Sequence, residues 1–238
     1  MSSGIYVATA GAVAQSNALD ATANNIANAA TAGFHGDRVT FREALTAARS
    51  PDVAVVGAGT ARVDTQAGAL TQTDNPLDLA LEGDGFFAVQ TPQGPRYTRA
   101  GNFQLDAERQ LVTSDGYAVR GEGGSPITIP PDASAIAVSA EGEVSADGAV
   151  VGKLELERFA PAQMKRQGGT LFAASGSPIT SGEPPKVRAG VLEASNVNVV
   201  RGVVDLVKVS RTYESLMRVI QGYHDVESRA ARDIGGPK

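Results

Sequence analysis

The first 36 residues carry a single formally charged side chain, Asp20, and this constrains the fold more than any other feature. A helix on the surface of its own domain normally turns a charged face to water. Here the polar positions hold Ser, Thr, Gln and Asn instead, among them Asn24, Asn25 and Asn28. These amides compete for backbone groups and disfavour an isolated helix. The pattern favours a helix that other protein surrounds, although a solvated helix end near Gly33 is the simpler alternative.

A heptad seam runs through this segment, because apolar and small residues recur at alternating spacings of three and four. Its members are Ile5, Ala8, Ala12, Gln15, Leu19, Thr22, Ile26 and Ala29. The alanines allow close helix approach but bury little apolar area, so the helix alone gains little stability. Gly33 is predicted to cap its C-terminus, because glycine adopts the left-handed conformation without steric cost.

A second long helix is predicted at the other end of the chain, from the N-cap Asn198 toward Asp233. Its seam is Val199, Val203, Leu206, Ser210, Tyr213, Met217, Ile220 and His224. Two helices with heptad seams at opposite ends of one chain are natural partners for each other. The predicted subunit interface comprises Ile5, Leu19, Asn24, Asn25, Ile26, Asn28, Val203, Leu206, Tyr213, Met217 and Ile220.

Between these helices the sequence changes character twice. Residues 37–50 are predicted to form a short helix that Pro51 ends. The stretch from Asp52 to Pro76 is rich in Gly, Thr and Val without a helical period, and is predicted to be an extended connector or paired strands. From Leu77 the hydrophobic period becomes two, as in a half-buried strand.

Many short strands separated by turn signals follow, and they predict an all-β domain, a barrel or a sandwich. The turn signals include Asp84-Gly85, Asp115-Gly116 and Asp147-Gly148. The predicted fold class is therefore α+β, with long terminal helices that pair as a coiled-coil-like domain and an inserted all-β domain. The predicted divisions are a helical assembly segment over residues 1–50, a connector over 51–76, the all-β domain over 77–185 and a second helical assembly segment over 186–238.

Composition argues against several functions. A net charge of −5 and a pI near 5.1 disfavour nucleic acid and anionic membranes as partners. The chain has no Cys, only two His and no Gly-x-Ser-x-Gly motif, so no catalytic, cofactor or metal site is predicted. The carboxylates Glu82, Asp84, Glu155 and Glu157 are candidates for a pair that cleaves glycosides, but exposed strand faces explain them more simply. Neither a transmembrane helix nor a cleavable secretory signal is expected.

Four blocks of sequence resemble one known family, the bacterial flagellar basal-body rod and hook proteins of the axial family. They are Asn24-Asn25-Ile26-Ala27-Asn28 with Thr31 and Gly33-Phe34; Leu79 to Val89; Tyr97 to Phe103 with Leu111-Val112 and Asp115-Gly116; and Leu192 to Asn198 with Arg211-Thr212-Tyr213-Glu214. The blocks span nearly the whole chain in the expected order. The chain departs from the family at His35, where Lys or Arg is common, at Ala30, where Asn is common, and at Arg201, where an acidic residue is usual.

The resemblance implies a structural subunit of the flagellar rod, the drive shaft that transmits torque from motor to hook. Its helices would form the inner tube and its β domain the outer wall. Implied partners are copies of itself, other rod proteins and the flagellar type III export apparatus, with assembly in the periplasm. The length and the segment from Gly152 to Phe172 resemble the proximal rod protein more than the longer distal one. The alternatives are a distal rod or hook-type subunit, or a β module that binds cell wall on oligomerisation helices.

Overall fold

The computed structural model describes residues 3–45 and 54–235, and they form two compact units. The helical unit takes its described residues from Met1–Ala27, Asp37–Arg62 and Asn198–Lys238. The β unit comprises Asn28–Gly36 and Val63–Val197. Each unit is therefore assembled from segments that lie far apart in the sequence.

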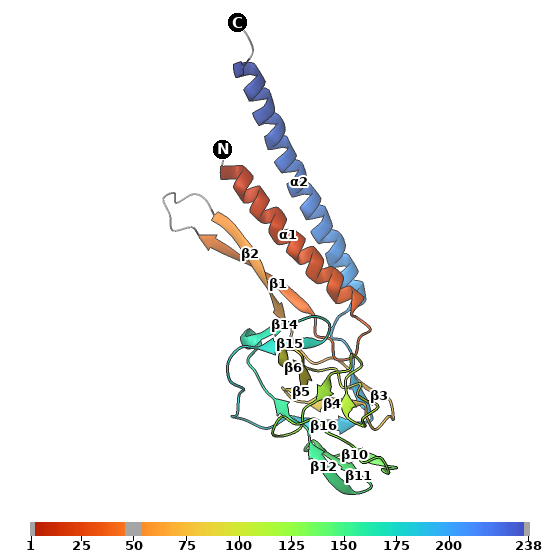
Figure 1. The fold of residues 1–238 in the computed structure, drawn as a ribbon. Coiled ribbons are helices and arrows are strands. Elements are labelled where there is room, and N and C mark those ends of the chain that lie inside the picture. The colour runs from red at the N-terminus through yellow and green to blue at the C-terminus, as the bar shows by residue number, and fades with distance from the viewer. Residues whose placement is uncertain (1–2, 46–53, 236–238) are drawn as a thin grey trace. The chain divides into compact units, whose positions relative to one another are not determined.

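Two long helices dominate the helical unit, α1 (Ser3–Ala27) and α2 (Val199–Gly235). They pack side by side, which confirms the predicted pairing (Figure 1). The predicted N-cap is also confirmed, because Oδ1 of Asn198 accepts a hydrogen bond of 3.0 Å from the backbone N–H of Arg201. With 37 residues, α2 is about 55 Å long.

A two-stranded hairpin completes this unit, formed by β1 (Asp37–Leu45) and β2 (Ala54–Val63) (Figure 1). The helix predicted over residues 37–50 is therefore wrong for residues 37–45, and its remainder lies outside the described residues. Val39 and Phe41 are two positions apart, a spacing that fits a strand as well as a short helix. The prediction of an extended or paired segment after Asp52 is confirmed by β2 and β3 (Leu70–Gln72).

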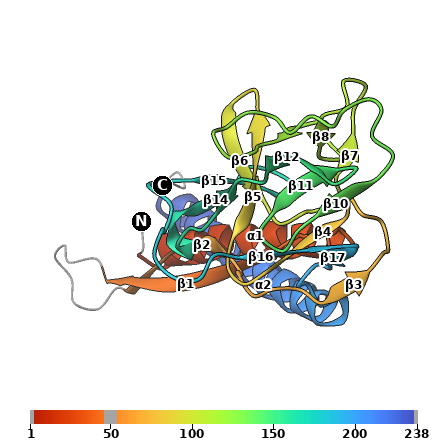
Figure 2. The same cartoon turned by 90° about the horizontal axis from the view of Figure 1, so that it is seen from below.

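The β unit contains several sheets, of which the largest has eight strands (Figure 2). The order along it is β14-β15-β6-β5-β9-β8-β7, with β13 paired to β5 beside that path. Its strands are β5 (Phe86–Thr91), β6 (Gly94–Thr98), β7 (Gln104–Leu105), β8 (Leu111–Val112), β9 (Ala118–Val119), β13 (Leu156–Glu157), β14 (Met164–Arg166) and β15 (Leu171–Ala174). A 3-10 turn, η1 (Pro161–Gln163), precedes β14. The outer strands β14 and β7 do not pair within the described β unit, so of the predicted barrel or sandwich the closed barrel is not formed, while the β-rich middle is confirmed.

Three smaller sheets accompany the large one. They are β10 (Ile136–Val138) with β11 (Glu143–Ala146) and β12 (Ala149–Lys153), β4 (Leu79–Glu82) with β16 (Lys186–Ala189), and β3 with β17 (Val191–Glu193). The chain bends between β4 and β5 where Asp84-Gly85 signalled a hairpin-type turn, but the two strands do not form a hairpin, because β4 pairs with β16 and β5 lies in another sheet. The strands nearest the C-terminal end of the unit thus pair with the strands nearest its beginning.

Strand β5 lies at the centre of the packing because both its faces are buried. Phe87 and Val89 belong to the main apolar core, while Phe86 packs into a second core and meets the Phe172 ring edge-on at 5.7 Å. Alternate residues of a strand point to opposite faces. A strand that is buried on both faces needs no polar alternation, which explains the continuous apolar run from Phe86 to Val89.

Candidate assembly surface

Contacts between glycines of one helix and side chains of the other show how α1 is aligned with α2. A Cβ added at Gly4 would lie 2.5 Å from Oη of Tyr223, and one added at Gly11 would lie 3.4 Å from Leu216. Near the other end of α1, the side chain of Ile26 lies 2.9 Å from the Cβ position of Gly202. The helices are therefore antiparallel. Since α1 begins at Ser3, the last turns of α2 extend past it (Figure 1).

Small residues fill the buried side of α1, where Ala8, Ala12, Ala14 and Ala18 are almost inaccessible to solvent. The predicted seam residues lie beside them and are half-buried in this single chain. They are Ile5, Leu19, Ile26, Leu206, Tyr213, Met217 and Ile220. The predicted seam of α2 is only partly correct, because its members Val199, Val203 and His224 are exposed and the residues that contact α1 include Gly202, Leu216 and Tyr223 instead. Whether the predicted seam residues also contact a neighbouring subunit stays a prediction.

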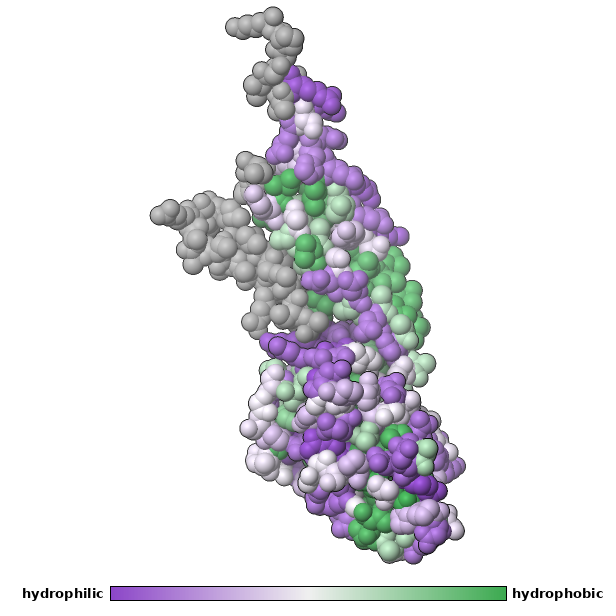
Figure 3. All heavy atoms as spheres, viewed as in Figure 1, coloured by the Kyte–Doolittle hydropathy of each residue, from purple (hydrophilic) through white to green (hydrophobic). Residues whose placement is uncertain are grey.

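The other faces of α2 remain apolar and exposed over its first turns. Five valines form this surface, which we call the valine strip: Val199, Val200, Val203, Val204 and Val207. Residues four apart lie on one helix face, so these valines form a continuous band. Figure 3 shows hydrophobic side chains gathered along this part of α2. Val200 is 77% exposed and Val203, which the sequence placed in the interface, is 46% exposed.

The valine strip was only partly predicted from the sequence, although a signal was present. Five of the nine residues from Val199 to Val207 are valine, so the apolar face of the helix is wider there than one heptad seam. One partner helix can cover only one such seam. The apolar surface of α2 is therefore wider than α1 alone covers.

The asparagines of α1 have different surroundings. Both polar atoms of the Asn25 amide bond the backbone of Asp37 at 2.8 Å, so this side chain holds the start of β1 within the helical unit. Asn28 accepts from the hydroxyl of Thr31 at 3.4 Å in the β unit. Asn24 is exposed on α1. Asn25 therefore serves an intrachain contact, a role that the sequence did not reveal.

Three buried charged or polar residues lie in contact inside the β unit: His35, Arg99 and Glu193. Nε2 of His35 lies 2.8 Å from Oε1 of Glu193, and Nη1 of Arg99 lies 3.3 Å from Oε2. The backbone N–H of Gly68 donates to the same carboxylate at 2.9 Å. Arg99 also donates to the carbonyls of Leu81 and Gly83, at 3.1 and 2.6 Å. This cluster joins segments from the beginning, middle and end of the unit.

Further contacts hold the incoming segment 28–36 to the same place. The N–H of Gly33 donates to the carbonyl of Glu193 at 2.7 Å, and the N–H of Gly36 donates to Oδ1 of Asn196 at 2.8 Å. The guanidinium of Arg166 lies 4.4 Å from the centre of the Phe34 ring and donates to the carbonyl of His35. We call this set of contacts, including the His35–Arg99–Glu193 cluster, the clasp.

Gly33 belongs to the clasp and does not have the capping role that the sequence predicted. Helix α1 ends at Ala27, so Gly33 is too distant to cap it. Gly33 does have a φ of +65°, but its Cβ position lies 2.2 Å from the backbone nitrogen of Ala100. Glycine is required here because two backbone segments meet, and only glycine leaves room for this approach.

The surroundings of Glu193 lower the pKa of its carboxyl group. Burial alone would raise that pKa, because it disfavours the charged form. The hydrogen bond with His35, the positive charge of Arg99 and the Gly68 amide outweigh burial and favour the carboxylate. Burial in turn lowers the pKa of the Arg99 guanidinium, while the charge of Glu193 opposes that effect.

This shift predicts how the stability of the β unit depends on pH. A carboxylate with a lowered pKa in the folded state stabilises the fold above its unfolded pKa, which is about 4.3, and this stabilisation is lost as the pH falls through the folded pKa. We expect wild-type protein and Glu193→Gln to differ most in urea midpoint near pH 7, and to converge as the pH falls below about 4.3. Urea titrations followed by amide NMR of the β unit measure both midpoints. A difference that stays constant from pH 7 to pH 3 would contradict the assignment.

The carboxylates considered for catalysis have structural partners. Glu82 lies 3.0 Å from Arg188 and Glu155 lies 3.1 Å from Arg120. Burial and the neighbouring Glu155 raise the pKa of Glu157. Among the residues that the structure describes, no group of three or more His, Asp or Glu side chains is placed to hold a metal ion. In the same part of the chain, no helix has the length and apolarity that crossing a bilayer requires.

Comparison with known families matches the chain in three places. Residues 5–35 match the family described as flagella basal body rod protein. Residues 80–146 match the flagellar hook protein FlgE/F/G D1 domain, and residues 188–233 match the flagellar basal body rod FlgEFG protein C-terminal region. The matches thus include α1, the middle of the β unit and α2.

Individual relatives are similar over the full chain. The flagellar basal-body rod protein FlgF of Rhizobium meliloti is 32% identical over 241 residues, with 100% of each chain covered. FlgF of Escherichia coli is 36% identical with 97% of each covered, and the rod protein FlgG of Caulobacter vibrioides is 36% identical with 91% of this chain and 93% of the relative covered. Together with the paired terminal helices and the β unit between them, these similarities show that the chain belongs to the FlgF/FlgG family of flagellar basal-body rod proteins.

Proposed function

We propose that this chain polymerises through its terminal helices into the flagellar rod, and that the rod transmits torque from motor to hook. Neighbouring subunits of the rod are copies of this chain and other rod proteins. The chain reaches the periplasm through the flagellar type III export apparatus. Within the predicted assembly segments 1–50 and 186–238, α1 and α2 make the subunit contacts, and residues 51–76 connect. Residues 77–185 form the body of the outer wall together with β16 and β17, which pair with strands of the β unit.

The valine strip is the observation that supports this proposal most strongly. Five valines on the first turns of α2 face solvent, and two of them, Val199 and Val203, belong to the predicted seam that α1 leaves uncovered there. Burying apolar surface contributes roughly 25 cal/mol per Å², so a neighbouring helix on this strip would stabilise the assembly. The outer face of α1 adds Tyr6 and Val13, and the whole helix carries one charge, Asp20. Such weakly charged, apolar faces suit contact with protein on several sides.

Coverage favours the proximal, FlgF type of rod subunit, because the FlgF relatives align over 97–100% of this chain and the FlgG relatives over 85–97%. The alignment with FlgF of Rhizobium meliloti extends over 241 positions, close to the 238 residues of this chain. We infer a position among the FlgF-type subunits of the rod.

Growth of the assembled species tests the proposal. A rod subunit adds head to tail with a rotation that does not close, whereas an oligomerisation module stops at a fixed size. We expect purified protein, mixed with isolated rod fragments as templates, to form species whose mass rises steadily with protein concentration. Analytical ultracentrifugation and negative-stain microscopy measure this growth. A single closed oligomer of constant mass would instead support the wall-binding module.

A further inference from the structure

The last segment of the β unit completes structures that begin at its other end. Strand β16 pairs with β4 from Lys186↔Glu82 to Ala189↔Leu79, and β17 pairs with β3 from Val191↔Gln72 to Glu193↔Leu70. The carbonyl of Ala194 lies only 1.8 Å from the Cβ position of Gly68, so these backbones touch. Asn196 bonds the backbone of Asp64, Gln66 and Gly36. Both β3 and β4 therefore lack their described ladder partner until residues 186–197 arrive.

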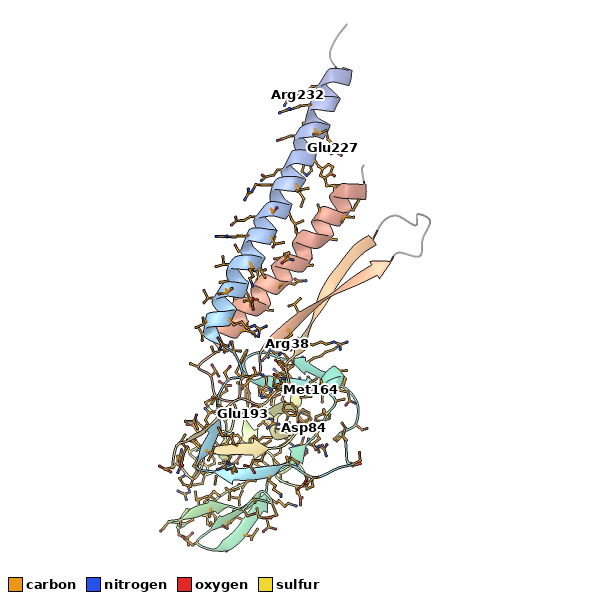
Figure 4. All side chains as sticks on the ribbon, turned by 180° about the vertical axis from the view of Figure 1, so that it is seen from behind. Arg38, Asp84, Met164, Glu193, Glu227 and Arg232 are labelled. Carbon is orange, nitrogen blue, oxygen red and sulfur yellow. The ribbon has the colours of Figure 1, made fainter. Side chains whose placement is uncertain are left out.

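Glu193 also supplies the negative charge in hydrogen-bond contact with two buried side chains (Figure 4 labels it). Arg99 is 3% exposed and His35 is 1% exposed. Without Glu193, the guanidinium of Arg99 would remain buried with only the carbonyls of Leu81 and Gly83 as hydrogen-bond partners in this part of the structure. Leaving a buried charge without its partner is strongly destabilising, more so than never placing the charge there.

We propose that Glu193 is the latch of the β unit: the unit closes only when this carboxylate contacts His35 and Arg99. A chain made from its N-terminus onward contains most of its strands long before residue 193 is available. Burying the Arg99 guanidinium without a carboxylate is unfavourable, so this partial domain stays open. The arrival of Glu193 then closes it in one step. The latch concerns folding of a single chain and does not depend on assembly through the helices.

Full-length variants test the charge requirement. Glu193→Gln keeps the shape of the side chain and the strand pairing of β17 but removes the charge. We expect amides of β5 and β6, which do not pair with β17, to exchange hydrogen about 100-fold faster in this variant. The matched control is Glu183→Gln, an exposed glutamate ten residues earlier whose ion pair with Lys186 lies on the surface. Exchange in β5 and β6 that is equal in both variants would overturn the proposal.

The double variant Arg99→Met with Glu193→Met separates charge from packing. It removes both buried charges together, a change that is often neutral in stability when the volume is kept. We expect slow exchange in β5 and β6 to return toward the wild-type rate. Exchange as fast as in Glu193→Gln alone would overturn the role of the Arg99 charge.

Discussion

Changing Val200 and Val204 together to Asp should abolish rod assembly and swimming while leaving both units of the protein folded. Both valines lie in the valine strip and are at least 49% exposed, so the isolated chain loses little packing when they are replaced. Position 200 lies in the first turn of α2, where the helix dipole favours a carboxylate, and position 204 lies exposed in the second turn, so α2 should remain intact. A buried unpaired charge in a subunit contact costs several kcal/mol, and every subunit of the rod repeats it.

Val150→Asp is the matched control for this experiment. Val150 lies on β12 in the β unit and is 64% exposed, so the same substitution is made at a comparable exposure away from the valine strip. Swimming in soft agar, tested in a strain that lacks its own copy, should be normal for the control and absent for the double variant. Circular dichroism of the purified variants checks that each is folded. Normal swimming of the double variant would refute the assembly role of the strip.

Replacing Gly33 by Ala should destabilise the β unit by about 4 kcal/mol or more, a loss seen only for severe substitutions. The added Cβ would lie 2.2 Å from the backbone nitrogen of Ala100 and 2.3 Å from the carbonyl carbon of Arg99. These atoms belong to the backbone and cannot move aside as a side chain does. The segment 28–36 must therefore withdraw, which also removes the contacts of Phe34 and His35.

Gly169→Ala separates this clash from backbone strain. Gly169 has a φ of +48°, in the same left-handed region as Gly33, but no heavy atom lies within 4 Å of its Cβ position. Only the intrinsic cost of a left-handed alanine applies there, roughly 1–2 kcal/mol. Urea unfolding of the two variants measures the difference. Equal losses of stability would mean that the contact with Ala100 is unimportant.

The sequence predicted the local elements well where a pattern was long. The two terminal helices have many turns in which a heptad can repeat, and their pairing and the Asn198 cap are confirmed. The segment 37–50 offered only a few apolar positions, and the spacing of Val39 and Phe41 fits either element. There the hairpin partner β2 decided the structure, and sequence periodicity cannot reveal a partner.

Long-range pairing accounts for the other errors. The turn residues Asp84-Gly85 follow β4 and precede β5, as in a hairpin, yet β4 pairs with β16 near the end of the unit. In the same way, His35 appeared in the sequence as a departure from the family pattern and Glu193 as part of a motif. Their contact with Arg99 depends on three segments meeting, and no local pattern records that.

The candidate assembly surface was predicted only in part. The seam residues Leu206, Tyr213 and Met217 were predicted from spacing, and in one chain they are half-buried. The neighbouring valines Val200 and Val204 extended the apolar face beyond one seam, and only the structure showed that α1 leaves them exposed. Sequence periodicity finds apolar faces but does not say how many partners cover them.

The central claim is that the valine strip is covered by a neighbouring subunit in the rod. A cryo-EM map of basal bodies purified from cells that carry this chain tests the claim most directly. The account predicts that Val200, Val203 and Val204 contact side chains of adjacent subunits and are excluded from solvent. A map in which these valines face solvent, with neighbouring subunits contacting only the β unit, would contradict it.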